Sequence, residues 1–153
     1  MVVAFVGHRK VENKKETVGR IYEALSDLIE NEDADTFLFG SRSEFDRLCF
    51  RVVTEMKKIY PNIRRVYVRA EWDYDDMKYL LENCEETFYP DKVRGAGAKV
   101  YVVRNQILID MCDVLVAYCD PNYHPPTNTK SGTQMAVSYA RKKKKRVINL
   151  FEE

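Results

Sequence analysis

Two segments of the chain carry hydrophobic side chains at every position. Residues 2–6 and 114–119 are continuously apolar, without the alternation of a half-exposed strand. A strand that is apolar on both faces is typical of the middle of a parallel sheet with helices on either side. Both segments are therefore predicted to be central strands. Shorter apolar segments predict three more main strands, at 36–39, 66–68 and 147–150.

The hydrophobic positions between these strands recur with the period of an α-helix. Residues 14–32 have such an apolar face, and Asn13 followed by Glu16 predicts a capping box at the start of that helix. Further helices are expected from Ser43 to Pro61, over 98–111 and over 131–144. The buried stripe of the helix over 98–111 is expected at Val100, Val103, Ile107 and Met111.

The region between residues 70 and 97 is less regular. A short helix is expected over 75–83 and a short edge strand over 87–89, before Pro90. The residues 94–97 have the composition of a mobile loop. A lid and a dimer arm are the two roles expected for this region, and both stay open at this point.

The alternation of strands and helices predicts the fold class. We expect an α/β protein with a single Rossmann-like, doubly wound, mainly parallel five-stranded sheet and helices on both faces, forming one domain over 1–153. The order of the strands should reverse between 2–6 and 114–119. Ligands of such sheets bind outside the carboxyl ends of the strands at this reversal.

Composition narrows the class of protein. The chain is 45% hydrophobic, so it can form a core, and 25 Lys and Arg against 24 Asp and Glu give a net charge of +1, which disfavours bulk binding of nucleic acid. No apolar segment is long enough to span a bilayer, and the start of the chain lacks the features of a signal peptide. The four cysteines form no C-x-x-C pair and there are two histidines, so we expect a reduced, cytoplasmic protein without metal or cofactor.

Glycine-bearing turns follow three of the predicted strands at the edge where a ligand is expected. Glycines let a ligand approach the backbone, the N–H groups at a helix start bind phosphate oxygens, and arginines neutralise charge. The candidate binding residues of these turns are Gly7, His8, Arg9, Gly40, Ser41, Arg42, Asp120, Ser131, Gly132 and Thr133, with Lys130 before them.

Each of these features also has a purely structural explanation. Ser43 and Asp46 are accounted for by helix capping, residues 131–133 by an ordinary helix start, and His8 by a bond to the backbone. Arg104 interrupts an apolar helix, and it either snorkels to solvent or reaches into the cleft. The chain contains no G-x-G-x-x-G, no P-loop and no G-x-S-x-G motif, which disfavours a dehydrogenase, a P-loop ATPase and an α/β-hydrolase.

The order of several short motifs resembles that of the SLOG superfamily, with the YpsA-like branch as the most similar. The resemblance covers nearly the whole chain and implies a Rossmannoid protein that binds a nucleotide or a nucleotide-derived ligand. Relatives include sensors of nucleotide second messengers, the LOG phosphoribohydrolases and the DprA-type proteins, which bind single-stranded DNA. The matching motifs are Gly7-His8-Arg9, Phe39-Gly40-Ser41 with Phe45-Asp46, Arg104-Asn105, Asp113 to Ala117, and Ser131-Gly132-Thr133 with Tyr139-Ala140.

Two departures from the LOG pattern bear on catalysis. Ala136 stands where LOG enzymes have the glutamate that works on the ribose bond, and Asn105 follows the arginine where they have lysine. Cleavage of an N-glycosidic bond needs a carboxylate, so an enzymatic function would have to use Asp46 or Glu44.

We therefore expect a binding module, a sensor or regulator whose ligand is a nucleotide-derived small molecule. Arg9, Arg42 or Arg104 would add positive charge, and Asn105 or Asp120 would contact the ribose or the base. The alternatives are a nucleotide N-glycosidase and a single-stranded nucleic-acid binder that uses the basic run 141–146. Because cations also favour the last turn of a helix, and Tyr139 is the one aromatic residue near the run, the nucleic-acid alternative is disfavoured. By analogy with the relatives, a homodimer is expected.

Overall fold

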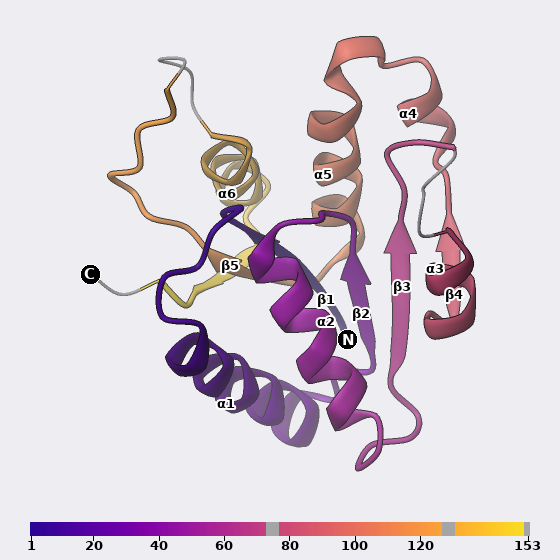
Figure 1. Cartoon of the computed structure of the whole chain (residues 1–153), viewed down its shortest axis with the longest axis vertical. Helices are drawn as coiled ribbons and strands as arrows, with labels where there is room; N and C mark the ends of the chain where they lie inside the picture. The colour runs from indigo at the N-terminus through magenta and orange to yellow at the C-terminus, as the bar shows by residue number, and fades with distance from the viewer. Residues whose placement is uncertain (73–76, 127–130, 152–153) are drawn as a thin grey trace.

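The computed structural model describes residues 1–72, 77–126 and 131–151, and a parallel sheet runs through them. Its six strands lie in the order β4-β3-β2-β1-β5-β6, and every neighbouring pair is parallel (Figure 1). The five predicted main strands are present. The segment expected at the edge is the sixth, so the prediction of a five-stranded sheet was one strand short. The strands are β1 (Val2–Gly7), β2 (Thr36–Phe39), β3 (Arg64–Val68), β4 (Glu86–Phe88), β5 (Val114–Tyr118) and β6 (Arg146–Asn149).

The order of the strands reverses at β1, as predicted. β1 pairs with β2 on one side and with β5 on the other. The chain adds β2, β3 and β4 outward from β1, then returns across the sheet to add β5 and β6. The reversal therefore brings the carboxyl ends of β1 and β5 side by side.

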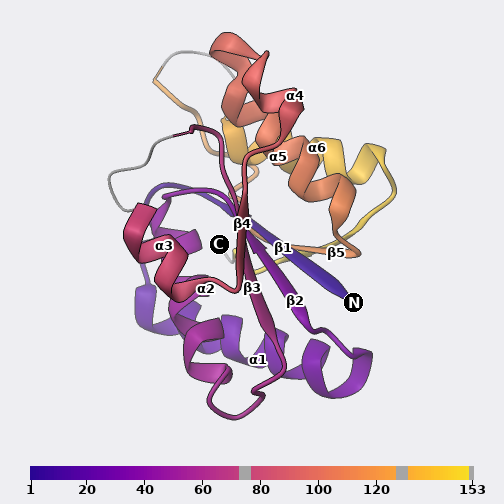
Figure 2. The ribbon, with the colours of Figure 1, turned by 90° about the vertical axis from the view of Figure 1, so that its right-hand side faces the viewer.

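Helices cover both faces of the sheet. In Figures 1 and 2, α1 and α2 lie on one face, and α5 and α6 lie on the other. The return from β4 to β5 carries α4, a 3₁₀ turn and α5. The helices are α1 (Lys14–Glu32), α2 (Glu44–Met56), α3 (Met77–Asn83), α4 (Asp91–Arg94), α5 (Val100–Met111) and α6 (Gly132–Lys142), and the 3₁₀ turn is η1 (Gly97–Lys99).

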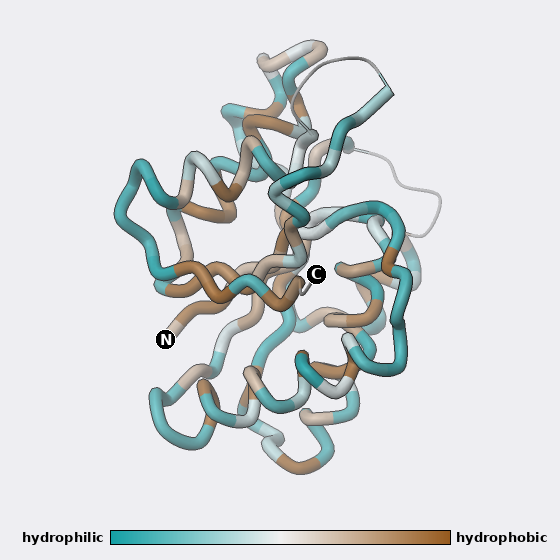
Figure 3. Tube along the Cα trace, turned by 90° about the vertical axis from the view of Figure 1, so that its left-hand side faces the viewer, coloured by the Kyte–Doolittle hydropathy of each residue, from teal (hydrophilic) through white to brown (hydrophobic). Residues whose placement is uncertain are grey.

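Each face of the sheet has its own core, and β1 contributes to both. Val3 and Phe5 pack in the core under α1 and α2, whereas Ala4 and Val6 pack in the core under α5 and α6. Figure 3 shows the hydrophobic segments of the trace gathered in the strands at the centre, with hydrophilic segments on the outer loops. This double burial is why β1 and β5 lack polar alternation.

The buried face of α5 differs from the prediction. Arg104, at 4% exposure, and Leu108 and Ile109 are the buried residues of this helix, while Met111 is 44% exposed. The physical reason is that α5 contacts α4 and α6 as well as β1, so its apolar residues face several neighbours and their spacing does not reveal the side on the sheet.

Several helix ends also differ from those predicted from the sequence. Asn13 makes no side-chain cap at the start of α1, and its backbone (φ −100°, ψ 72°) departs from the extended conformation that an N-cap usually has. Glu16 pairs with Arg20, so the predicted capping box is absent. α2 ends at Met56, before the predicted stop at Pro61, and the expected loop 94–97 contains the end of α4 and the start of η1. Of the helix predicted over 75–83, residues 77–83 are α3, and 75 and 76 lie outside the described residues.

All four cysteines are free thiols, and Cys49, Cys112 and Cys119 are buried in the core. Within the described ranges, no helix combines the length and the apolarity that crossing a bilayer requires.

Two glycine substitutions should have opposite effects on stability. A Cβ on Gly7 would overlap the ring of Phe45, which is fully buried, so Gly7→Ala is expected to destabilise the fold by about 1–3 kcal/mol. Gly19 lies in α1 with open space around it, and Gly19→Ala should stabilise the fold by about 1 kcal/mol. Urea unfolding of both variants measures the difference, and equal midpoints would contradict the assigned packing of Gly7.

Candidate functional site

The turns after β1, β2 and β5 emerge at one edge of the sheet. Gly7 and Tyr118 are register partners at the ends of β1 and β5, and Phe39 ends the neighbouring strand β2. The segments after these three strands carry the predicted binding residues. The edge therefore brings together the turns that start at His8, Gly40 and Cys119.

A chain of hydrogen bonds joins the ends of β1 and β5 to α6. The backbone N–H of Asp120 donates to Nε2 of His8 at 2.8 Å, and the side-chain amide of Gln134 donates to the carbonyl of Asp120 at 3.2 Å. The His8 ring is 8% exposed and lies 4.6 Å from the ring of Tyr123. His8 thus bonds the backbone, the structural role considered for it, and it does so at the predicted edge.

Burial lowers the pKa of His8 below its usual value of 6.5, while the nearby negative charge of Asp120 acts in the opposite direction. The low pKa agrees with the hydrogen bond, because Nε2 can accept from Asp120 only when it carries no proton. At neutral pH the ring is therefore an uncharged part of the site.

The start of α6 offers backbone donors. Ser131 forms a capping box with Gln134, which uses the N–H groups of both residues. The N–H groups of Gly132 and Thr133 donate no hydrogen bond within the described part of the chain. Apart from its chain neighbours and the backbone of its own helix, no atom of the described residues lies within 4 Å of the point where a side chain on Gly132 would begin. Lys130 lies outside the described residues.

The turn after β2 is held by a buried carboxylate and a buried arginine. Oδ2 of Asp46 accepts from the N–H groups of Gly40 and Ser41 at 3.4 and 3.0 Å, and the carbonyl of Gly40 accepts from Arg104 and from the hydroxyl of Tyr67. Ser43 caps α2 by accepting from the N–H of Asp46. Ser43 is thus confirmed as the cap of α2, whereas the Asp46 side chain holds the Gly40 turn.

Arg104 is buried against the edge and does not snorkel to solvent. A Cβ on Gly40 would lie 2.6 Å from Cδ of Arg104, so the arginine stem fills the space that the glycine leaves. Nε of Arg104 donates to the side-chain carbonyl of Asn105 at 2.9 Å, which sets the direction of the guanidinium. The space beside Gly7 is occupied in the same way by the ring of Phe45. At both glycines, a side chain of the protein itself therefore takes the space that a ligand was expected to use.

Asp46 is 2% exposed, and its Oδ1 has no hydrogen-bond partner in the described structure. Burial raises its pKa to about 7, against the lowering effects of the Ser41 N–H, the charge of Arg104 and the Gly40 N–H. Glu44 is also engaged: Oε2 accepts from the N–H of Val11 at 2.6 Å, and Oε1 lies 3.3 Å from Nζ of Lys14. Both carboxylates therefore hold loops at the edge.

The exposed arginines lie around these turns. Arg9 and Arg42 are exposed, and the carbonyl of Arg9 accepts from the N–H of Glu44 at 2.9 Å. This bond ties the turn after β1 to the start of α2. Both arginines are thus carried on turns whose backbone is fixed.

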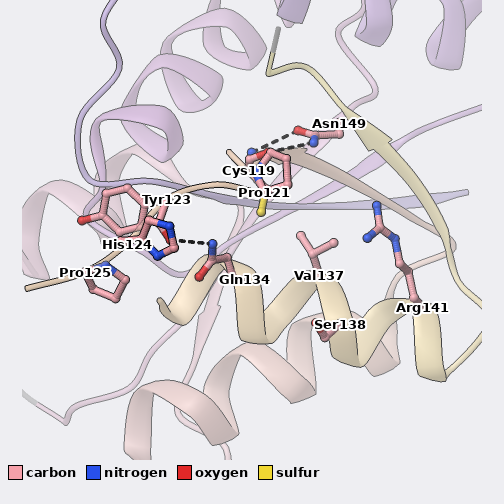
Figure 4. Close-up of a pocket in the computed structure, with 10 residues that line it drawn as sticks. All are labelled: Cys119, Pro121, Tyr123, His124, Pro125, Gln134, Val137, Ser138, Arg141 and Asn149. Carbon is pink, nitrogen blue, oxygen red and sulfur yellow. Dashed lines mark hydrogen bonds between the residues drawn. The ribbon is translucent and has the colours of Figure 1, made fainter. Parts of the chain in front are cut away.

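A cavity of about 480 Å³ lies near the turns described above. None of the binding residues predicted from the sequence lines this cavity. Figure 4 shows α6 along one side, the segment 119–125 opposite, and Arg141 at the end away from His124. No ion pair of Arg141 is found among the residues described. In the sequence, Arg141 stands out only as the first residue of the basic run 141–146. The lining residues are Cys119, Pro121, Tyr123, His124, Pro125, Gln134, Val137, Ser138, Arg141 and Asn149.

No protein-family model matches this chain, and no curated protein matches it in sequence.

The lowered pKa of His8 predicts a dependence of stability on pH. The unfolded chain takes up a proton near pH 6.5 and the folded chain only at lower pH, so His8 contributes a loss of stability as the pH falls below about 6.5. His8→Gln keeps a side-chain acceptor and cannot titrate. The difference in unfolding free energy between wild type and this variant, measured from pH 7.5 to 5, should shrink in acid, and a difference that stays constant would contradict this role of His8.

Asp46 predicts the opposite dependence on pH. Its pKa is raised from 3.8 to about 7, so the folded state holds the proton and the contribution to stability falls as the pH rises from about 4 to about 7. Asp46→Asn should abolish this fall while keeping an acceptor for the turn. Asp46→Ala should cost about 2–4 kcal/mol, because the buried N–H of Gly40 and the partly buried N–H of Ser41 lose their acceptor. Equal urea midpoints for the two variants would contradict this role.

Proposed function

We propose that the carboxyl edge of the sheet binds a nucleotide or a nucleotide-derived ligand, and that the protein is a sensor or regulatory module. The single observation that carries the proposal is the pair of backbone N–H groups at Gly132 and Thr133, which donate no hydrogen bond to any described residue, at the start of an 11-residue helix. Such groups, together with the positive end of the helix dipole, form an anion site that suits phosphate.

The surroundings of these donors support a ligand with polar groups beyond the phosphate. The hydrogen-bond chain from His8 through Asp120 to Gln134 lies where the strand order reverses, which is where ligands bind in open α/β sheets. The Asp120 carboxylate accepts from the N–H of Asn122, and its remaining lone pairs suit ribose hydroxyls.

The Rossmann-like character of the fold and the resemblance to SLOG proteins of the YpsA-like branch support the same class of ligand. The strand order, with its reversal at β1, fits that resemblance. The motifs at Gly7, Gly40 and Gly132 lie at one edge of the sheet, and of these three glycines Gly132 has open space beside it for a ligand.

We propose binding rather than N-glycosidic hydrolysis because the candidate carboxylates are already used. Asp46 is buried and holds the Gly40 turn, and Glu44 holds the loop after β1. Ala136, at the position of the LOG glutamate, is 4% exposed and packs in the core under α6.

The proposal is tested by thermal shift with AMP, NAD, ADP-ribose and a cyclic dinucleotide, with adenosine as the ligand that lacks phosphate. A ligand at 100 times its dissociation constant should stabilise the fold by about 2.7 kcal/mol. Gly132→Asp sets a carboxylate at the helix start, where space is open and the dipole favours it, so the free protein should remain as stable. Its affinity for the phosphate ligand should fall about tenfold or more.

Gly132→Asn is the neutral control of similar size and should bind more tightly than Gly132→Asp. The proposal is wrong if no phosphate ligand stabilises the protein, or if Gly132→Asp binds as wild type. Release of a free base, followed by chromatography, would favour the hydrolase instead.

A further inference from the structure

A cluster of two arginines and two aromatic rings lies at the same edge of the sheet, after β3 and β4. Arg69 follows the end of β3, Tyr89 follows the end of β4, Arg94 is the last residue of α4, and Trp72 is 59% exposed. We call these four residues the arginine–aromatic cluster. The proposed nucleotide site at Gly132 does not use them.

Both guanidinium groups face both rings. The Cζ atom of Arg69 lies 5.3 Å from the Trp72 ring and 5.9 Å from the Tyr89 ring, and Cζ of Arg94 lies 5.5 and 5.2 Å from the same rings. The two rings are 6.0 Å apart and meet edge to face. Cation–π contacts thus gather two positive charges at one exposed aromatic surface.

The positive charge of the cluster is poorly compensated. Among the residues described, Asp91 is the carboxylate within ion-pair distance, 3.9 Å from Nε of Arg94, and its side chain is 99% exposed, so this pair contributes little. Arg69 donates to the carbonyl of Trp72 at 2.9 Å, while its buried Nε–H has no hydrogen-bond partner in the described structure. No carboxylate of the described residues other than that of Asp91 pairs with either arginine, and two neighbouring positive charges repel each other and attract an anion.

Two guanidinium groups beside an exposed indole suit a ligand that carries both a phosphate and an aromatic base. A phosphomonoester carries a charge near −2 at neutral pH, which matches two guanidinium groups, and the planar forks of arginine suit phosphate oxygens. An exposed indole offers a flat surface on which a base can stack. We propose that the arginine–aromatic cluster is a second ligand site, which binds a nucleoside monophosphate with its phosphate on Arg69 and Arg94 and its base on Trp72.

This site is tested by the emission of Trp72, because the chain contains a single tryptophan. AMP should quench the tryptophan emission saturably. Adenosine and inorganic phosphate, which each keep half of the ligand, should bind about tenfold more weakly or worse. Arg94→Gln, which removes an exposed arginine, and Arg69→Gln should each raise the dissociation constant for AMP about tenfold.

Arg64→Gln is the matched control. Arg64 is the first residue of β3, and Arg69 follows the last, so the two arginines lie at opposite ends of this strand. Arg64→Gln therefore removes the same charge at a point away from the cluster, where Arg64 pairs with Glu86. Its variant should keep the wild-type affinity for AMP. Equal effects of Arg64→Gln and Arg94→Gln would overturn the site, because the loss would then reflect net charge alone.

The outcome separates this site from the proposed function. If AMP stabilises the protein in a manner that Gly132→Asp abolishes but leaves the emission of Trp72 unchanged, the second site is wrong and the first stands. If AMP quenches Trp72 and Gly132→Asp has no effect on any ligand, the second site stands and the first is wrong. Quenching by a single-stranded oligonucleotide but not by AMP would also overturn the nucleotide assignment.

Discussion

The parallel pairing of β1 with β5 is the constraint on which the rest of the structure depends. Both strands are buried on both faces, so each must find parallel partners on both sides and helices above and below. Their register sets Gly7 beside Tyr118, and the turns that follow must emerge together. The return from β4 to β5 then carries α5 across the face opposite α1 and α2. The position of Arg104 over the Gly40 turn follows from that crossing.

Much of this arrangement follows from local pattern, and the exceptions have physical causes. The central strands are visible in the sequence because double burial removes alternation, and Ser43 with Asp46 shows the start of α2 because a cap is a local interaction. The buried face of α5 is not visible in the sequence, because the apolar residues of this helix face several neighbours and so lie on more than one side. For the same reason, the sequence singles out Arg104 as a charge within an apolar helix but leaves open whether its side chain is buried or exposed.

At the candidate site, too, one part could be predicted from the sequence and another could not. The residues that follow β1, β2 and β5 meet because the topology requires it, so their order along the chain was enough to find them. What occupies the space at each glycine depends on side chains from other elements: Phe45 at Gly7 and Arg104 at Gly40. The cluster around Trp72 was also missed, since its four residues come from two separate turns, after β3 and after β4, and from an element of four residues. A net charge of +1 gives no sign of such a local concentration of arginine.

The empty space around Gly132 has a consequence for how such a protein can change over generations. Mutations at Gly7 and Gly40 are constrained by the side chains packed on them, so selection for folding acts there directly. At Gly132, new side chains cost the fold little, and each would alter what reaches the start of α6. Descendants of one ancestral scaffold could therefore diverge in ligand preference at this position while inheriting the same architecture unchanged.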